Sequence, residues 1–454
     1  MNKDSVISDF VPGLIAGTIN AIVCIVSAMA LAALIFTGPL AEYLSQGIGI
    51  LLVGTVIFAV LSALTATYPL IFSAPQDIPI AILALMAATV AAGMGGEMTG
   101  EQLYRFIFVA IGLTSILVGL FFYILGRFKL GKLVRYIPFP VVGGFLAGTG
   151  WLIVKFSFAM MTDLDLSLAN MVILFEKNIF NQWFPGFVFA VVLLLVTRQF
   201  SHYLLTPGIL FGSIALFYMV MFARGFSYTA LEANGHLLGP FPDGGLFPGL
   251  PFEYVSRFRW DLFIVHLPAI GTMMILNAVA VLFNYSGLEL IVKEDFDLNK
   301  ELRLTGYNNM VAGLAGTPAG YITLSETSMS YNLGARSRLP SIVVAVFCTV
   351  TLIFGAKVLS IFPKVILGGL LLNLGLEFLM EWLYDTRKRL QKTDYTVIVL
   401  ILIVIGSIGF LEGIVLGLLM SIVLFVINYS KVEVIKYQLT GKTFSSNVER
   451  SSHL

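Results

Sequence analysis

Charged residues and cysteines are scarce in this sequence of 454 residues. Asp, Glu, Lys and Arg together make up 12% of the chain, about half of their usual share in soluble proteins. So few charged side chains cannot cover the surface of a water-soluble domain of this length, which excludes an ordinary soluble protein. The two cysteines, Cys24 and Cys348, both lie within apolar runs. We expect them to be small buried side chains and not a disulfide pair.

The motifs of common enzyme chemistry are also missing. The four histidines are too scattered for a metal site, and no P-loop, nucleophile elbow or zinc-ligand spacing occurs. We therefore expect no enzyme activity, no metal and no cofactor. The net charge is +1, and nucleic-acid binding has no support. No cleavable signal peptide is expected, because the first residues, MNKDSVISDFVPG, lack the basic, apolar and small pattern.

Long apolar segments dominate the chain instead. Hydrophobic residues make up 58% of the sequence. A membrane-spanning helix needs ~20 apolar residues, and Gly, Pro and charge clusters divide the chain into fourteen such segments. The sequence thus predicts an all-α polytopic membrane protein. The predicted spans lie near 11–35, 48–66, 70–92, 104–125, 137–158, 185–199, 205–223, 262–290, 300–315, 320–333, 339–357, 361–380, 394–410 and 412–430.

Positive charges are unevenly distributed among the loops between these spans. With a cytoplasmic N-terminus, 19 of the 27 Lys and Arg residues fall on the inner side. Cytoplasmic loops carry an excess of Lys and Arg, so this bias supports both the number of spans and their orientation. We expect an integral protein of the cell (inner) membrane with both termini in the cytoplasm.

The longest insert, residues 224–261, is rich in Gly and Pro and is interpreted as an external loop. It separates a first repeat, 1–223, from a second repeat, 262–430, which a cytoplasmic tail at 431–454 follows. Each half has seven spans, an odd number, so the two halves face the membrane in opposite directions. This inverted-repeat arrangement is typical of secondary transporters.

The third span of each half is interrupted. Residues 68–88, YPLIFSAPQDIPIAILALMAA, contain two prolines, which favour extended backbone before a half-helix that starts near Gln76. Residues 316–335, GTPAGYITLSETSMSYNLGA, follow the same plan, with a half-helix that starts near Ser325. Non-helical backbone at membrane depth is tolerated only where protein buries it or a wet cavity lines it. Two opposed helix N-termini would form a site for a small anion.

One acidic residue lies at the start of each half-helix, Asp77 in the first and Glu326 in the second. Asp77 is interpreted either as a local cap of its helix or as the group that takes up a proton or a cation during transport. Ionisable groups at the bilayer centre are costly and usually functional. Glu326 is either a second proton-coupling acid or an exposed group at the inner end of its span.

Polar residues of two other spans could reach the same site. Asn20 and Ser27 in the first span are seven residues apart and share a helix face, as do Asn277 and Asn284 in the eighth. Hydrogen bonding between helices is the alternative role of these residues. The complete set of predicted substrate-binding residues is Ser73, Gln76, Asp77, Thr323, Ser325, Glu326, Asn20, Ser27 and Asn277, with Asp77 and Glu326 as the proton-coupling groups.

Three stretches resemble the SulP or sulfate permease family, called solute carrier family 26 in animals. Residues 297–339, DLNKELRLTGYNNMVAGLAGTPAGYITLSETSMSYNLGARSRL, are similar to the start of that family's span 9, its Gly-rich crossing and the Gly-Ala-Arg end of span 10. Residues 137–150, IPFPVVGGFLAGTG, and 362–372, FPKVILGGLLL, are similar to its spans 5 and 12. Together with the order of the spans, the resemblance covers nearly the whole chain.

The resemblance implies seven plus seven inverted spans, with a core domain of spans 1–4 and 8–11 and a gate domain of spans 5–7 and 12–14. The core would move like an elevator against a homodimer formed through the gate. The substrate would bind between the half-helices of spans 3 and 10. Family members mostly carry sulfate, bicarbonate, chloride, oxalate or dicarboxylates, by exchange or with coupled protons or sodium.

Three features depart from the family's pattern. Many members carry arginine where this chain has Glu326, so an acid replaces a cationic partner for the anion. Span 8 usually offers an acid where this chain has Asn277, which argues against a sodium site. Members normally continue into a cytoplasmic STAS domain. Residues 432–454 resemble the linker to such a domain and then stop, so the domain is either lost or truncated.

These observations predict a secondary active transporter of a small anion of the sulfate, bicarbonate or carboxylate type, proton-linked and working by an elevator mechanism. Two alternatives stay open. Asp77 and Glu326 make the predicted pocket negative with no Lys or Arg nearby, which favours a small cation such as a basic amino acid. An anion channel is the other alternative. The expected partners are the substrate, the lipid bilayer and a second copy of the chain.

Overall fold

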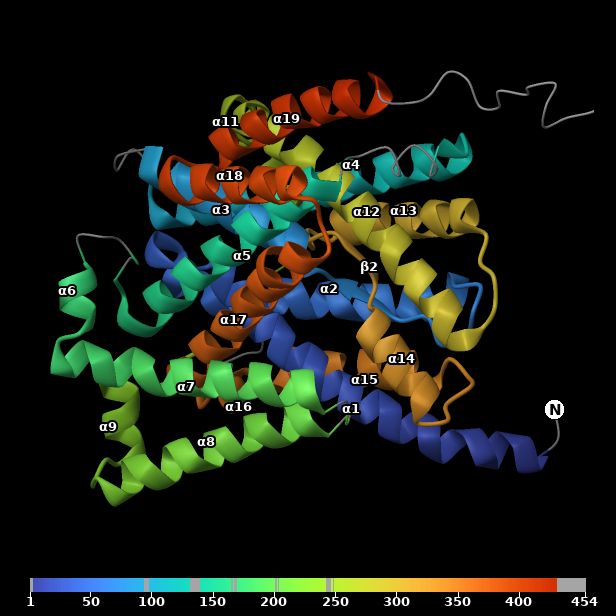
Figure 1. Ribbon diagram of the computed structural model, residues 1–454. Helices are drawn as coiled ribbons and strands as arrows, with labels where there is room; N and C mark the ends of the chain where they lie inside the picture. Colours follow the sequence, from blue (N-terminus) through green and yellow to red (C-terminus); the bar gives the residue numbers. More distant parts are fainter. Residues whose placement is uncertain are drawn as a thin grey trace, which may run out of the picture.

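The computed structural model describes residues 3–93, 98–130, 139–164, 166, 170–200, 202, 204–241, 246, 247 and 249–430. The predicted tail at 431–454 lies outside the described residues, as do parts of the predicted external loop. Helices account for most of what is described (Figure 1).

Long helices occur in both halves of the chain (Figure 1). The first half contains α1 (Lys3–Ile35), α2 (Leu44–Thr65), α3 (Asp77–Gly93), α4 (Gly100–Arg127), α5 (Phe139–Thr162), α7 (Lys177–Gln199) and α8 (Leu205–Ala223). The second half contains α12 (Leu267–Val292), α13 (Leu298–Leu314), α14 (Leu324–Asn332), α15 (Leu339–Phe354), α17 (Lys364–Leu379), α18 (Lys392–Ser407) and α19 (Phe410–Ser430).

Short helices connect these long ones. They are η1 (Gly38–Tyr43), α6 (Met171–Leu174), α9 (Tyr228–Ala233), α10 (Phe252–Val255), α11 (Trp260–Val265), α16 (Ala356–Ser360), η3 (Met380–Asp385) and η4 (Thr386–Lys388). Among the described residues, η3 has the wide turn of a π-helix. Such turns are rare and often occur at functional sites.

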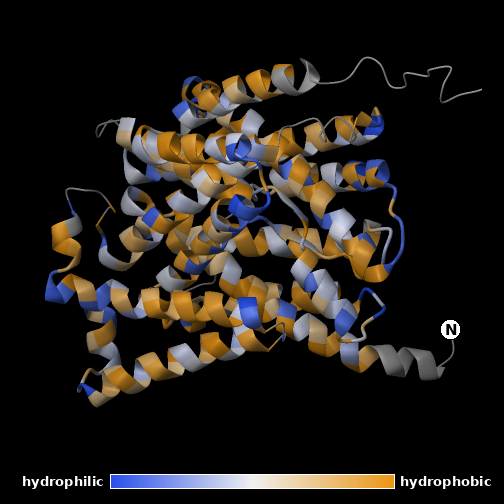
Figure 2. Cartoon of the chain, viewed as in Figure 1, coloured by the Kyte–Doolittle hydropathy of each residue, from blue (hydrophilic) through white to orange (hydrophobic). Residues whose placement is uncertain are grey.

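Hydrophobic residues occur along most of the length of the helices (Figure 2). Eight helices of the described residues are long and apolar enough to cross a membrane. In α8 only 6% of the most apolar window is buried inside the protein. An apolar helix face that the protein leaves uncovered needs lipid around it, since water would disfavour it. These features agree with the predicted polytopic helical membrane protein.

Two three-residue strands meet at the centre of the molecule. β1 (Ser73–Pro75) pairs antiparallel with β2 (Gly320–Ile322), with Ser73 opposite Ile322 and Pro75 opposite Gly320. The sequence predicted extended backbone in both stretches but not that they pair with each other. The pairing has a physical reason, because each strand satisfies backbone groups of the other where no water is available.

Close packing of α4 against α13 anchors the second strand. The two helices lie side by side (Figure 1), and glycines at their contact bring the backbones together. A Cβ atom on Gly119 would lie 2.6 Å from the backbone oxygen of Gly306, and one on Gly306 would lie 2.6 Å from the oxygen of Gly119. Gly112 and Gly313, seven residues along each helix, make the same close backbone contact with each other. Small residues at helix contacts are the usual means of close approach in membranes.

Asn309 of α13 joins this helix pair to the strands. Its Nδ2 donates hydrogen bonds to the carbonyl oxygens of Gly320, at 2.7 Å, and Thr305, at 2.8 Å. Its Oδ1 accepts the backbone N–H of Gly320 at 2.8 Å. A single buried amide therefore satisfies both backbone groups at the start of β2.

Replacing Asn309 with leucine is expected to lower the free energy of unfolding by about 2 to 4 kcal/mol, since two buried backbone groups of Gly320 would lose their partner. Thermal unfolding of the purified protein in detergent measures the effect. Asn332→Leu is the matched control, because Asn332 is exposed at the end of α14. Equal melting temperatures of the two variants would show that Asn309 does not hold β2.

Candidate functional site

The helices α3 and α14 both begin at the strand pair. α3 starts at Asp77, two residues after β1, and α14 starts at Leu324, two residues after β2. Because the strands are antiparallel, the two helices leave the pair in opposite directions (Figure 1). The backbone N–H of Gln76 donates to Ala319 at 3.2 Å, and that of Thr323 donates to Phe72 at 2.9 Å. These bonds hold both helix N-termini, with their unpaired N–H groups and positive dipole ends, at one place.

A cavity of about 1100 Å³ opens beside these N-termini. One side of it is formed by α1, α12, β1, β2 and the starts of α3 and α14, and the opposite side by α5, α17 and η3. This volume is at the upper end of the range for small-molecule sites.

Six of the nine predicted site residues line this cavity: Ser27, Gln76, Asp77, Thr323, Ser325 and Glu326. Asp77 Oδ1 accepts the backbone N–H of Ile78 at 2.8 Å, so the carboxylate both caps α3 and faces the cavity. The two roles left open for this residue are therefore compatible. Gln76 Nε2 donates to the carbonyl oxygens of Ala74 and Tyr321, at 3.1 and 3.3 Å, which leaves its Oε1 for a ligand.

The other three predicted residues do not line the cavity. Asn20 is buried behind α14, where its Nδ2 donates to Glu326 O at 3.3 Å and Ser330 Oγ at 3.0 Å. It is placed to orient the helix that carries Glu326. Ser73 is buried within β1.

Asn277 differs from Asn284, although the spacing predicts one shared face. Asn284 lines the cavity, and its Nδ2 donates to Ile322 O at 2.9 Å. Asn277 is fully buried, and within the described part of the chain its side chain has no hydrogen-bond partner. Its neighbours Leu276 and Ala280 take the cavity-facing positions. Seven residues do not complete two whole helical turns, so the face drifts between the two asparagines.

Sequence reasoning missed the acids on the opposite wall. Glu377 of α17 and Glu381 of η3 line the cavity, four residues apart, with Arg389 nearby on the same side. Asn373 Nδ2 donates to Glu377 Oε1 at 2.9 Å and so orients that carboxylate. A signal was present in the sequence, because Asn373, Glu377 and Glu381 recur with helical spacing at the end of an apolar run. Because a charged stretch follows directly, the same residues also fit the solvated end of a membrane span.

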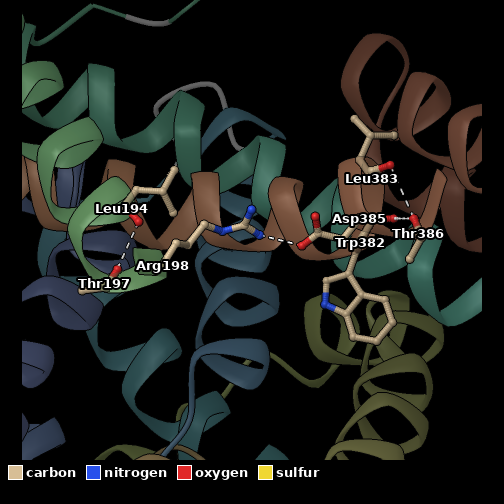
Figure 3. Close-up of polar contacts among 7 residues, drawn as sticks. All are labelled: Leu194, Thr197, Arg198, Trp382, Leu383, Asp385 and Thr386. Atoms are coloured by element: carbon tan, nitrogen blue, oxygen red, sulfur yellow. Dashed lines mark hydrogen bonds and ion pairs between the residues drawn. The ribbon is translucent and has the colours of Figure 1, made fainter. Parts of the chain in front are cut away.

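An ion pair ties this wall to α7. Arg198 in the last turn of α7 donates to Asp385 Oδ2 at 2.6 Å, and Figure 3 shows the contact alongside Trp382 and Thr386. Asp385 ends η3, and Glu381, four residues earlier in the same helix, lines the cavity. Both side chains of the pair are more than a third exposed, so solvent weakens this link between η3 and α7.

The charge of the cavity is strongly negative. Among the described residues that line it are four carboxylates, Asp77, Glu326, Glu377 and Glu381, and one guanidinium, Arg389. Asp77 and Glu326 lie on one side of the cavity and Glu377 and Glu381 on the other, and carboxylates gathered around one cavity repel one another. Mutual repulsion of this kind favours a bound proton or a bound cation. No cluster of three or more metal-ligating side chains occurs among the residues that the structure describes.

Residues 10–401 match the family model described as "Sulfate permease family". The chain belongs to the sulfate permease family. The resemblance predicted from the motifs is thereby confirmed. The protein is an integral membrane protein of a family of transporters.

Similar proteins are named for different substrates. The vacuolar basic amino acid transporter VSB1 of Saccharomyces cerevisiae is 25% identical over 81% of this chain and 36% of its own length. The bicarbonate transporter BicA of Picosynechococcus is 22% identical over 74% of this chain and 57% of its own length. "Probable sulfate transporter 3.5" of Arabidopsis thaliana is 25% identical over 71% of this chain and 51% of its own length. The chain thus spans between a third and two thirds of these relatives.

Solved structures share the sulfate permease fold. The transmembrane domain of a cyanobacterial bicarbonate transporter, BicA, aligns with a TM-score of 0.63 at 19% identity, covering 90% of this chain and 97% of that one. The overall structure of SLC26A9 aligns with a TM-score of 0.71 at 16% identity, covering 96% of this chain and 69% of that one. These alignments confirm the predicted helical membrane fold.

Proposed function

We propose that this member of the sulfate permease family is a proton-linked secondary transporter that carries a basic amino acid. The observation that carries the proposal is the charge of the cavity, where four carboxylates face one guanidinium. A binding site is complementary in charge to its ligand. A dianion such as sulfate would meet a net negative site, whereas the side chain of an arginine or lysine substrate would pair with one of its carboxylates.

The helix N-termini are complementary to the carboxylate of an amino acid. An amino acid also carries a carboxylate, and transporters bind such a group at the positive ends of interrupted helices. The starts of α3 and α14 offer two such ends beside the acids. A basic amino acid can therefore pair its carboxylate with the helix N-termini and its two cationic groups with the acids of one cavity. Similarity to the yeast basic amino acid transporter supports this substrate class.

A small anion is the second candidate, favoured by the same two helix N-termini and by relatives named for sulfate and bicarbonate. In that case Asp77 and Glu326 must take up protons before the anion binds, because two carboxylates beside it would repel it. Transport of an anion would then be coupled to protons as well, so binding of the predicted anion is physically possible once both acids are protonated.

The proposal includes the predicted architecture. Fourteen spans in two inverted repeats, with interrupted spans 3 and 10, are supported by the strand and helix that follow one another in each half. An elevator movement is supported by the place of the cavity between α1, α3, α12 and α14 on one side and α5 and α17 on the other. The homodimer and the cytoplasmic termini in the inner membrane remain part of the proposal.

Uptake into proteoliposomes of labelled arginine, sulfate and bicarbonate, with and without a pH gradient, tests the function. We expect saturable arginine uptake that a pH gradient drives and that excess unlabelled lysine inhibits. Saturable sulfate uptake without arginine uptake would favour the anion. Currents that scale with voltage and show neither saturation nor exchange would favour a channel.

Replacing Glu377 with glutamine is expected to raise the KM for arginine about tenfold, because one charged partner of the substrate is lost while Asn373 can still hold the amide oxygen. Initial rates of uptake against arginine concentration measure KM. Glu294→Gln is the matched control, since Glu294 is exposed and lies outside the cavity. If both variants have the wild-type KM, the acidic wall does not bind the substrate.

A further inference from the structure

A second cavity lies between α7, α8 and the start of α17. Its volume is about 550 Å³. None of the described residues that line it also lines the cavity beside the starts of α3 and α14, the transport cavity. Two strong cations, Arg224 and Lys364, and the ring of His236 gather at one end, with Asp163 as the one acid among the described residues that line it. The remaining wall is largely apolar and comes from α7 and α8.

Among the described residues that line this cavity, the single acid Asp163 does not balance the two cations. Within the described residues, no ion pair joins Arg224 or Lys364 to an acid. Lys364 is the first residue of α17, so its ammonium lies at the positive end of a 16-residue helix. A cation there is unfavourable unless an anion lies nearby.

His236 belongs to the same end. Its carbonyl oxygen accepts the backbone N–H of Lys364 at 2.9 Å, which fixes the loop beside α17. Burial and the charge of Lys364 lower the pKa of the His236 ring, which favours its neutral form with one N–H donor. Arg224, Lys364 and the His236 ring therefore line one cavity, and two cations with one N–H donor are groups that bind a phosphate.

The apolar wall opens sideways to the surface that faces lipid. Its residues Val188 and Val192 of α7 are 42% and 44% exposed, and Leu216 and Val220 of α8 are 59% and 40% exposed. Figure 2 shows the two helices as mostly hydrophobic along this side. A free inorganic phosphate would make no use of such a wall, whereas acyl chains would cover it.

We propose that this cavity binds an anionic phospholipid, with the phosphate at Arg224 and Lys364 and the acyl chains along the groove between α7 and α8. The lipid bridges α8 to the start of α17, two segments that are distant in sequence. This inference is independent of which substrate the transport cavity carries.

Native mass spectrometry of the full chain in detergent, with added phosphatidylglycerol or phosphatidylcholine, tests the proposal. Each cation near a phosphate is worth about fivefold in lipid affinity. We expect the double variant Arg224→Gln, Lys364→Gln to bind phosphatidylglycerol about 20- to 30-fold less tightly, with phosphatidylcholine binding unchanged. Lys177→Gln is the matched control, because Lys177 is an exposed cation at the start of α7 outside the cavity.

A second variant tests the apolar half. Val192→Trp keeps both cations but fills the groove, so it is expected to weaken phosphatidylglycerol binding as well. Unchanged phosphatidylglycerol binding in the double variant would overturn the proposal. So would a site that inorganic phosphate fills equally well in wild type and Val192→Trp, which indicates a free anion. A change from dimer to monomer mass in the double variant, with lipid binding retained, would instead indicate a subunit interface.

Discussion

Arginine uptake by an Asp77→Asn variant is expected to fall about 100-fold relative to the wild type, because removing one partner of a desolvated charge pair costs several kcal/mol. The substitution leaves the helix cap intact. Asp77 Oδ1 accepts the Ile78 N–H at 2.8 Å, and the asparagine oxygen can take the same place. Only the negative charge at the start of α3 is lost. Uptake of labelled arginine into proteoliposomes measures the effect.

The matched control for this prediction is Asp295→Asn, since Asp295 is an exposed acid outside the cavity. Equal melting temperatures of both variants would show that a loss of uptake is not a loss of folding. Undiminished arginine uptake by Asp77→Asn would remove Asp77 from the transport site. Sulfate uptake that increases in the same variant would favour the anion, because the repelling charge is gone.

A Gly119→Leu variant is expected to lose its folded state to a large extent, with a destabilisation of about 3 kcal/mol or more. A Cβ atom at this position would lie 2.6 Å from Gly306 O and 2.7 Å from the backbone N of Met310, well inside van der Waals contact. Both obstacles are backbone atoms, so no side chain can turn away and α13 itself must move. Fluorescence-detected size exclusion after heating measures the remaining folded protein.

Gly271→Leu is the control for the effect of leucine itself. Gly271 lies in the apolar helix α12, and no atom lies within 4 Å of the position of an added Cβ. This variant is expected to melt like the wild type. If Gly119→Leu also melts like the wild type, α4 and α13 do not need backbone contact.

The transport cavity shows which parts of a site a sequence can reveal. Asp77 and Glu326 stood out because a charged residue beside a proline or a small polar run interrupts an apolar span. That is a local pattern, and both residues line the cavity. Glu377 and Glu381 lie at the end of an apolar run and continue into a charged stretch, which is the ordinary appearance of a span leaving the membrane. Their place in the cavity depends on the packing of α17 against α5 and α7 and of η3 against α5.

For the two strands, too, the sequence predicted local backbone conformation but not the tertiary partner. Proline and glycine predicted extended backbone around residues 73–75 and 320–322, because these residues restrict or free the backbone locally. Pairing joins stretches about 250 residues apart, and Asn309 then holds β2 at its start. No local pattern specifies such partners.

Composition and the long apolar segments by themselves determined that this chain is a polytopic helical membrane protein, and its motifs determined the family. Both follow from the cost of placing polar groups in lipid, which acts on each segment separately. Tertiary structure alone decided the balance of charge in the cavity. α17 packs against α5 and α7, and η3 packs against α5, which places two further acids in the same cavity as Asp77. The net charge of the site is therefore a sum over two walls that the chain brings together only when it folds.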